Sequence, residues 1–138
     1  MISLLISKEY PARIPRKQLD FLYAKAMEAG DLKHGAIVQI IFTGDSEIRD
    51  LNRKYRGLDE ITDILTFQSE FPHPQYCGDI VIDIEQAERQ KGKASLQKEL
   101  LVLFIHGLMH LIGYDHIRKD DRLRMMAKEK EYLSFIKE

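Results

Sequence analysis

The most constraining feature of the sequence is a long apolar stretch, SLQKELLVLFIHGLMHLIG, at residues 95–113. Its apolar side chains fall on nearly every side of a helix, and such a helix is buried in the middle of a domain. The helix is expected to end at Gly113 because glycine tolerates the positive φ that helix ends often adopt. The rest of the chain must therefore pack around this helix.

The composition is that of a globular protein. The 138 residues are 44% hydrophobic and 31% charged, which predicts one domain spanning residues 1–138. A single cysteine excludes an intrachain disulfide. The longest purely apolar run, Leu100–Ile105, is too short for a membrane span, so we expect a cytoplasmic protein and a monomer. Because the net charge is only -1, any basic residues that contact nucleic acid must be concentrated locally.

Strand-like and helix-like segments alternate along the chain, which predicts an α+β domain with a small mixed sheet and helices packed on it. Strands are expected at residues 1–7, 36–42, 62–67 and 78–84. Helices are expected at residues 15–29, 46–56, 85–90, 95–113 and 119–136. The inner face of the last helix is expected to carry Leu123, Met126, Ala127 and Leu133.

Three histidines, His106, His110 and His116, lie within eleven residues in the segment HGLMHLIGYDH. His106 and His110 are four residues apart on the predicted central helix, so their imidazoles project from one face and can bind one metal ion. A turn at Gly113 can bring His116 back towards the same ion. Three imidazoles with an open fourth position favour a catalytic zinc ion, with nickel, cobalt, iron and manganese as alternatives.

The H-x3-H-x5-H spacing is also that of the metzincin proteases, which use a glutamate after the first histidine as general base. Here that position is Gly107, and Glu99 lies about two helical turns away, too far for the same task. The pattern therefore predicts a hydrolytic metal site without the peptidase base. Asp115 beside His116 either orients an imidazole or stabilises the turn.

Three arginines, Arg49, Arg53 and Arg56, form a positive stripe on the helix predicted at residues 46–56. Such a stripe is either a solvated face or a substrate-binding one. Arg56 lies at the end of the helix, and an arginine beside a zinc ion can hold a phosphodiester through its planar guanidinium. We therefore interpret Arg56 and His110 as the candidate catalytic residues.

Several segments of the sequence resemble those of a known protein family. HGLMHLIGYDH is similar to the H-G-x-x-H-L-x-G-Y-D-H signature of the YbeY family, the bacterial rRNA maturation factors. The segments IIFTGDSEIRDLNRKYRGLDEITDILTF and CGDIVIDI also resemble family segments, so the match runs from about Ile37 to His116. The chain departs from the family pattern at Gly44, Thr66, Gln68 and Cys77, none of them a predicted metal ligand.

The resemblance implies a zinc-dependent endoribonuclease, specific for single-stranded RNA, that acts in ribosome biogenesis and in maturation of the 3′ end of 16S rRNA. The zinc ligands carry over to His106, His110 and His116, and the family's RNA-contacting arginine to Arg56. The small ribosomal subunit is the implied partner, with no DNA and no membrane. The attacking group is either water or the 2′-OH of the RNA.

Two other functions remain open on the sequence. A non-catalytic ribosome-assembly factor could use the zinc ion structurally, with a fourth ligand such as Asp115 closing the site. A metalloprotease shares the ligand spacing but lacks the glutamate.

Overall fold

The structure is a computed structural model that describes residues 2–6, 13–69, 75–114 and 119–136. In these residues four strands form one mixed sheet: β1 (Ile2–Ile6), β2 (Ile37–Thr43), β3 (Ile64–Gln68) and β4 (Tyr76–Asp83). They also form five helices: α1 (Arg16–Glu28), α2 (Asp45–Arg56), α3 (Ile84–Gln90), α4 (Leu96–Ile112) and α5 (Lys119–Leu133). The predicted α+β class is confirmed.

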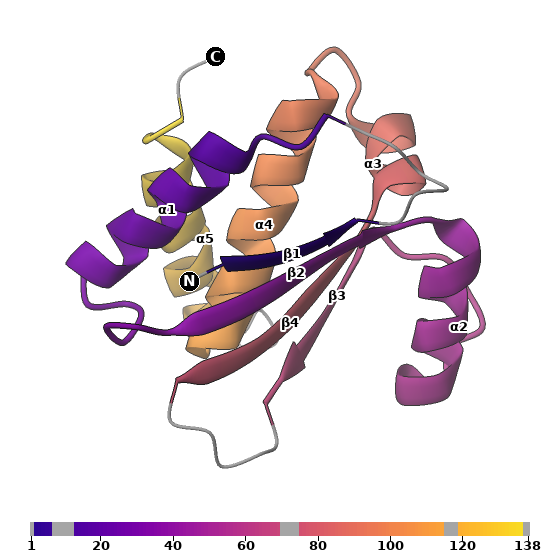
Figure 1. Cartoon of the computed structure of the whole chain (residues 1–138), viewed down its shortest axis with the longest axis horizontal. Helices are drawn as coiled ribbons and strands as arrows, with labels where there is room; N and C mark the ends of the chain where they lie inside the picture. Colours follow the sequence, from indigo (N-terminus) through magenta and orange to yellow (C-terminus); the bar gives the residue numbers. More distant parts are fainter. Residues whose placement is uncertain (1, 7–12, 70–74, 115–118, 137–138) are drawn as a thin grey trace.

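The strands lie in the order β1-β2-β4-β3, so β3 forms one edge of the sheet (Figure 1). β1 pairs with β2, and β2 with β4, in parallel, whereas β3 runs antiparallel to β4. Parallel neighbours need a crossover, which α1 supplies between β1 and β2. The short antiparallel strand β3 leaves a sheet edge beside which α2 and the C-terminal end of α4 can both lie.

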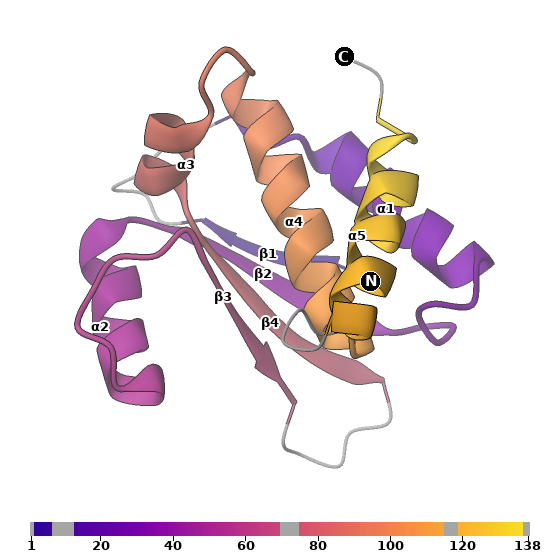
Figure 2. The ribbon, with the colours of Figure 1, turned by 180° about the vertical axis from the view of Figure 1, so that it is seen from behind.

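The main core lies between α4 and one face of the sheet. Val38, Ile40 and Phe42 alternate along β2, and all three are fully buried, as the two-residue period of a strand requires. Ile80 and Ile82 of β4 pack on the same side. Figure 2 shows α4 lying across the sheet with α5 beside it, which confirms the prediction of a central buried helix.

α4 lies close against the sheet at Gly107. A Cβ atom built at this position would lie 2.9 Å from Ile64 Cδ1 and 2.9 Å from Ile80 Cγ2. Atoms cannot approach this closely without displacement of the isoleucines, so the helix–sheet distance depends on the missing side chain. A glutamate at this position would clash with the core.

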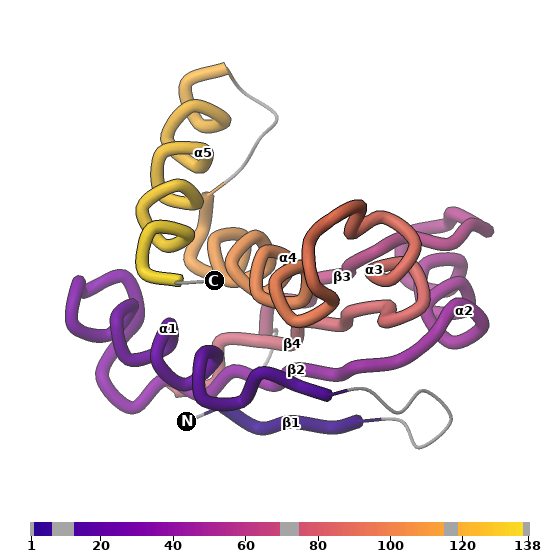
Figure 3. Tube along the Cα trace, turned by 90° about the horizontal axis from the view of Figure 1, so that it is seen from above, coloured from indigo at the N-terminus to yellow at the C-terminus, as the bar shows by residue number. Residues whose placement is uncertain are grey.

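The predicted inner face of α5 is wrong for Leu123, Met126 and Ala127, whereas Leu133 is partly buried against the core as expected. Leu123 and Met126 are 53% and 58% exposed, whereas Met125 and Tyr132 are buried. The buried face runs through Met125, Glu129 and Tyr132, at spacings of four and three residues. A polar contact helps to fix which face of α5 points inward: the hydroxyl of Tyr132 donates to Asp31 Oδ2 at 2.6 Å. In Figure 3, α5 lies farther from the sheet than α4 does.

The second face of the sheet has a smaller apolar cluster under α2. Ile48 of α2 is buried against Leu65 and Val81, which point away from the main core. The buried amide of Asn52 donates to the carbonyl oxygen of Glu60 at 3.0 Å and so holds the segment that follows α2. In the described part of the chain, α2 covers only part of this face, and a cleft lies beside it.

Candidate functional site

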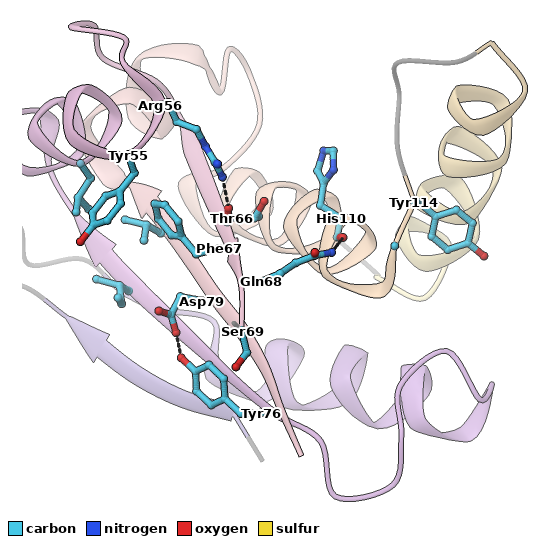
Figure 4. A pocket seen from close by; sticks show the side chains of 14 residues that line it. Tyr55, Arg56, Thr66, Phe67, Gln68, Ser69, Tyr76, Asp79, His110 and Tyr114 are labelled. Atoms are coloured by element: carbon cyan, nitrogen blue, oxygen red, sulfur yellow. Dashed lines mark hydrogen bonds between the residues drawn. The ribbon is translucent and has the colours of Figure 1, made fainter. Parts of the chain in front are cut away.

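A cleft with a volume of about 880 Å³ lies on the open face of the sheet and extends past β3 to the C-terminal end of α4 (Figure 4). Its apolar floor includes Ile41, Phe67 and Val81. Arg56 and His110 both line it, from α2 and α4 respectively, on either side of β3. The structure thus brings the two candidate catalytic residues to one cleft.

His106 and His110 lie one turn apart on α4 with their imidazoles facing each other. Their Nε2 atoms are 3.2 Å apart, and the rings meet edge to face with centroids 4.7 Å apart. Two imidazole ligands of one tetrahedral zinc ion, each about 2.0–2.1 Å from the metal, have nitrogens about 3.3 Å apart. The separation in this chain therefore fits two ligand positions on one metal ion.

The second nitrogen of His106 faces α5. Its Nδ1 atom lies 3.5 Å from Oε2 of Glu129, whose side chain is 24% exposed. Metal-binding histidines commonly have a carboxylate on the nitrogen that does not bind the metal. Glu129 is therefore a candidate to orient His106. The predicted third ligand, His116, and the predicted orienting residue, Asp115, lie outside the described residues.

The three arginines of the predicted stripe differ in their surroundings. Arg56 donates through Nη2 to the carbonyl oxygen of Thr66 at 2.6 Å, and its guanidinium lies 5.1 Å from the centre of the Phe67 ring. Arg49 and Arg53 instead pair with carboxylates at 2.8 Å and 3.3 Å, from Asp59 and Asp50 respectively. Of these three arginines, Arg56 is the one found among the described residues that line the cleft.

A carboxylate lies at the far end of the cleft floor. The hydroxyl of Tyr76 donates to Oδ1 of Asp79, and both residues line the cleft. Burial and the neighbouring Asp79 raise the pKa of Tyr76 to about 12, so the phenol keeps its proton and stays a donor. The amide of Gln68 donates to the carbonyl oxygen of His110 at 3.3 Å and ties β3 to α4.

A separate acidic cluster joins α2 to α3. Ligand oxygens of Asp45, Asp83 and Glu85 lie within 4.8 Å of one another and could hold a metal ion. However, Arg89 already binds both oxygens of Asp45, at 2.9 Å and 2.7 Å, and supplies positive charge there. Burial, followed by hydrogen bonding with Asp45, raises the pKa of Asp83 to about 7. The histidine pair thus remains the better candidate metal centre.

Sequence reasoning missed Glu129, Tyr76 and Asp79. Glu129 contacts His106 from a helix 23 residues away, and no local pattern reports such a contact. Asp79 lies within the CGDIVIDI segment, which was interpreted as a strand and as a family-like segment, with no role for Asp79. Its position on the second face of β4, opposite Ile80 and Ile82, is the signal that marks it as a cleft residue.

The fold, the histidine pair and the adjoining cleft define a small α+β protein with a candidate metal centre. A sequence profile described as "Endoribonuclease YbeY" matches residues 6–137. The chain belongs to the YbeY endoribonuclease family, which confirms the resemblance noted in the sequence and supports an RNA-cleaving activity.

Individual relatives agree with this assignment. Endoribonuclease YbeY of Pelotomaculum thermopropionicum is 42% identical over 107 residues, covering 71% of this chain and 70% of the relative. Endoribonuclease YbeY of Shouchella clausii is 36% identical over 129 residues, covering 83% and 80%. A solution structure of a Thermotoga maritima protein is similar with a TM-score of 0.62 and 30% identity, covering 97% of this chain and 87% of that one. Across the described parts of the chain, each helix falls short of the length or apolarity that a membrane span needs.

Proposed function

We propose that this chain is a zinc-dependent endoribonuclease that cuts single-stranded RNA during rRNA processing, including the 3′ end of 16S rRNA. It would act in the cytoplasm as a monomer, with the small ribosomal subunit as its partner. The observation that carries the proposal is the 3.2 Å separation of the His106 and His110 Nε2 atoms. His110 also lines the cleft that Arg56 borders.

His106, His110 and His116 would hold the zinc ion, the last of them from outside the described residues. A zinc ion bound in this way lowers the pKa of water and polarises a phosphate oxygen. Glu129 keeps His106 in one orientation by contact with Nδ1. Cleavage products that end in a 2′,3′-cyclic phosphate would identify the RNA 2′-OH as the attacking group, and products without it would indicate water.

Arg56 is the residue that positions the phosphodiester. A guanidinium has five N–H donors, and the hydrogen bond to Thr66 uses one of its nitrogens, so other donors are available for phosphate oxygens. The contact with the Phe67 ring holds the guanidinium at the rim of the cleft. There it can offset the negative charge that develops on the phosphate during cleavage.

Arg49 and Arg53 would add weaker contacts to the RNA backbone. Both are exposed, and exposed ion pairs contribute at most about 1 kcal/mol, so phosphates can compete with Asp59 and Asp50 for them. Because the net charge of the chain is -1, binding depends on this local stripe. RNA affinity should therefore fall as salt concentration rises.

The position of Gly107 counts against the metalloprotease alternative, since a glutamate there would clash with Ile64 and Ile80. The alternative function as a ribosome-assembly factor differs from the proposal because it involves no cleavage of RNA. A structural zinc ion predicts that removal of the metal unfolds the chain and that the metal-loaded protein leaves RNA intact.

The decisive experiment is cleavage of a labelled single-stranded RNA by zinc-loaded protein, with the same RNA in a duplex as comparison. His110→Ala is purified in parallel, and His34→Ala, an exposed histidine outside the cleft, is the matched control. Wild type and His34→Ala should cut the single strand, and His110→Ala should not. Equal cutting by all three proteins, or none by zinc-loaded wild type, would contradict the proposal.

A further inference from the structure

We infer that the cleft also reads a nucleobase of the bound RNA, and that Asp79 with Tyr76 selects guanine over uracil. This inference rests on the proposed function, because it assumes that single-stranded RNA occupies the cleft. It adds a base preference that the histidines and Arg56 do not provide. The residues that carry it lie on β3 and β4, away from the candidate metal ligands (Figure 4).

Asp79 is held in a fixed position on the cleft floor. The Tyr76 hydroxyl donates to its Oδ1 atom and also lies 3.4 Å from Oε1 of Gln39 on the neighbouring strand. A carboxylate has about four lone-pair sites, and the tyrosine contact uses one of them. Asp79 is only partly buried, so its remaining acceptor capacity faces the cleft.

The charge of Asp79 shows which part of an RNA chain it can contact. A carboxylate repels the phosphate backbone, which carries the same sign of charge. It can only accept hydrogen bonds, and the donors of single-stranded RNA are the ribose 2′-OH, which every nucleotide carries, and the N–H groups on the edges of its bases. Asp79 therefore suits a base, whereas Arg56 at the other side of Phe67 suits a phosphate.

The arrangement of donors on the bases favours guanine. The Watson–Crick edge of guanine has two adjacent donors, N1–H and the N2 amino group, which match the two oxygens of a carboxylate. Uracil has one N–H between two carbonyl oxygens, and those oxygens would face the carboxylate. A good bidentate pair discriminates between bases by about 1–3 kcal/mol, which is about fivefold to 150-fold in affinity.

An aromatic surface for stacking lies directly beside this carboxylate. Phe67 of β3 is the register partner of Asp79 on β4, so the two side chains are neighbours on one face of the sheet. Tyr55 meets Phe67 edge to face with ring centroids 5.4 Å apart, and Tyr55 is 55% exposed. Bases stack on such rings in proteins that bind single-stranded RNA.

The test is equilibrium binding, measured by fluorescence anisotropy, of protein kept metal-free with a chelator, so that it does not cut the RNA. The three labelled RNAs are a short oligouridine and the same RNA with one guanosine or one adenosine in the middle. A gel after each titration verifies that the RNA is intact. Wild type should bind the guanosine RNA about tenfold more tightly than the oligouridine. The adenosine RNA separates base reading from the stacking that any purine offers.

Asp79→Asn is the informative variant, because an amide both donates and accepts and thus matches uracil better than guanine. The preference for guanosine should fall to about onefold or reverse. Asp20→Asn, which removes the same charge from an exposed site on α1, should keep it. If Asp79→Asn fails to fold, Tyr76→Phe, which releases the carboxylate, should lower the preference at least about threefold.

Failure of the base-reading inference and failure of the proposed function give different results in this experiment. Equal affinity of wild type for the guanosine RNA and the uridine or adenosine RNA would overturn the base-reading inference alone. An unchanged preference in Asp79→Asn, or in Tyr76→Phe if that variant replaces it, would overturn the role of this carboxylate. Absence of binding to all three RNAs would overturn the proposed function together with the inference.

Discussion

The Nδ1 atom of His106 lies 3.5 Å from the Oε2 atom of Glu129, so α5 contacts the candidate metal centre from behind. This contact explains why the buried face of α5 includes a glutamate. It also makes the position of α5 relevant to the histidines on α4, although α5 lies farther from the sheet than α4 does.

Replacing Glu129 should weaken metal binding without unfolding the chain. Glu129→Gln removes the charge that favours one orientation and tautomer of His106, and such outer contacts are worth about tenfold to a hundredfold in metal affinity. Zinc affinity is measured by competition with a chromogenic chelator. Glu131→Gln, an exposed site on the same helix, is the control. Equal zinc affinities of the two variants would show that Glu129 does not position the ligand.

Replacing Arg56 should reduce cleavage more than stability. Arg56→Lys keeps the charge but loses the planar fork that holds a phosphate, so we expect the rate of RNA cleavage to fall about a hundredfold. The melting temperature should change little, since the side chain is exposed and its contacts with Thr66 and Phe67 are at the rim. Lys17→Ala on α1 serves as the comparison. Full activity in Arg56→Lys would exclude a bidentate role.

The buried carboxyl group of Asp83 should make the free energy of unfolding larger in weak acid than at pH 8. Burial raises the pKa of Asp83 from 3.8 to about 7, so the folded state holds this proton more tightly than the unfolded chain does. The stabilising contribution is complete below about pH 4 and is lost as the pH rises to about 7. At pH 8 the ionised carboxylate therefore opposes folding. The pKa of Asp45 shifts downward, chiefly through Arg89, so the stabilisation by Asp45 is lost only at still lower pH.

Asp83→Asn tests this sign. Asparagine is as good a helix N-cap as aspartate, and its amide can donate to Asp45 where the proton of Asp83 would. In urea titrations the variant should be about 1–3 kcal/mol more stable than wild type at pH 8, and no more stable at pH 4. Parallel stability curves for the two proteins between these pH values would contradict the raised pKa.

Tyr132 should anchor α5. Its buried hydroxyl donates to Asp31 at 2.6 Å, and Lys128 approaches the same carboxylate at 3.2 Å. Tyr132→Phe removes one hydrogen bond to a charged acceptor, so we expect a loss of about 1.5–3 kcal/mol in the free energy of unfolding. Tyr55→Phe, at a side chain that is 55% exposed, should lose almost nothing. Similar losses for both variants in urea titrations would exclude Tyr132 as a special anchor.

The parts of the fold that depend on local pattern could be predicted from the sequence. The run at residues 95–113 gave α4, and the four-residue spacing placed His106 and His110 on one face of it. Contacts between distant segments could not be predicted in this way. The polar Glu129 and Tyr132 interrupt the apolar pattern of α5, so most of its inner face was assigned wrongly.

The cleft residues likewise differ in whether local sequence alone could identify them. Arg56 was singled out because it ends its helix, and it borders the cleft. Asp79 and Tyr76 could not be placed there before the register of β3 against β4 was known. The assignments of His116 as a metal ligand and Asp115 as an orienting residue stay predictions, since both residues lie outside the described part of the chain.

The alternation of side chains along β4 has a consequence for how this protein can diversify. Ile80 and Ile82 face the main core, whereas Asp79 and Val81 face the other side. If RNA occupies the cleft as proposed, substitutions at the cleft-facing positions can alter which RNA binds, while the packing under α4 and the spacing of the histidines stay the same. Under the proposed function, base preference can therefore change while the spacing of His106 and His110 on α4 is kept.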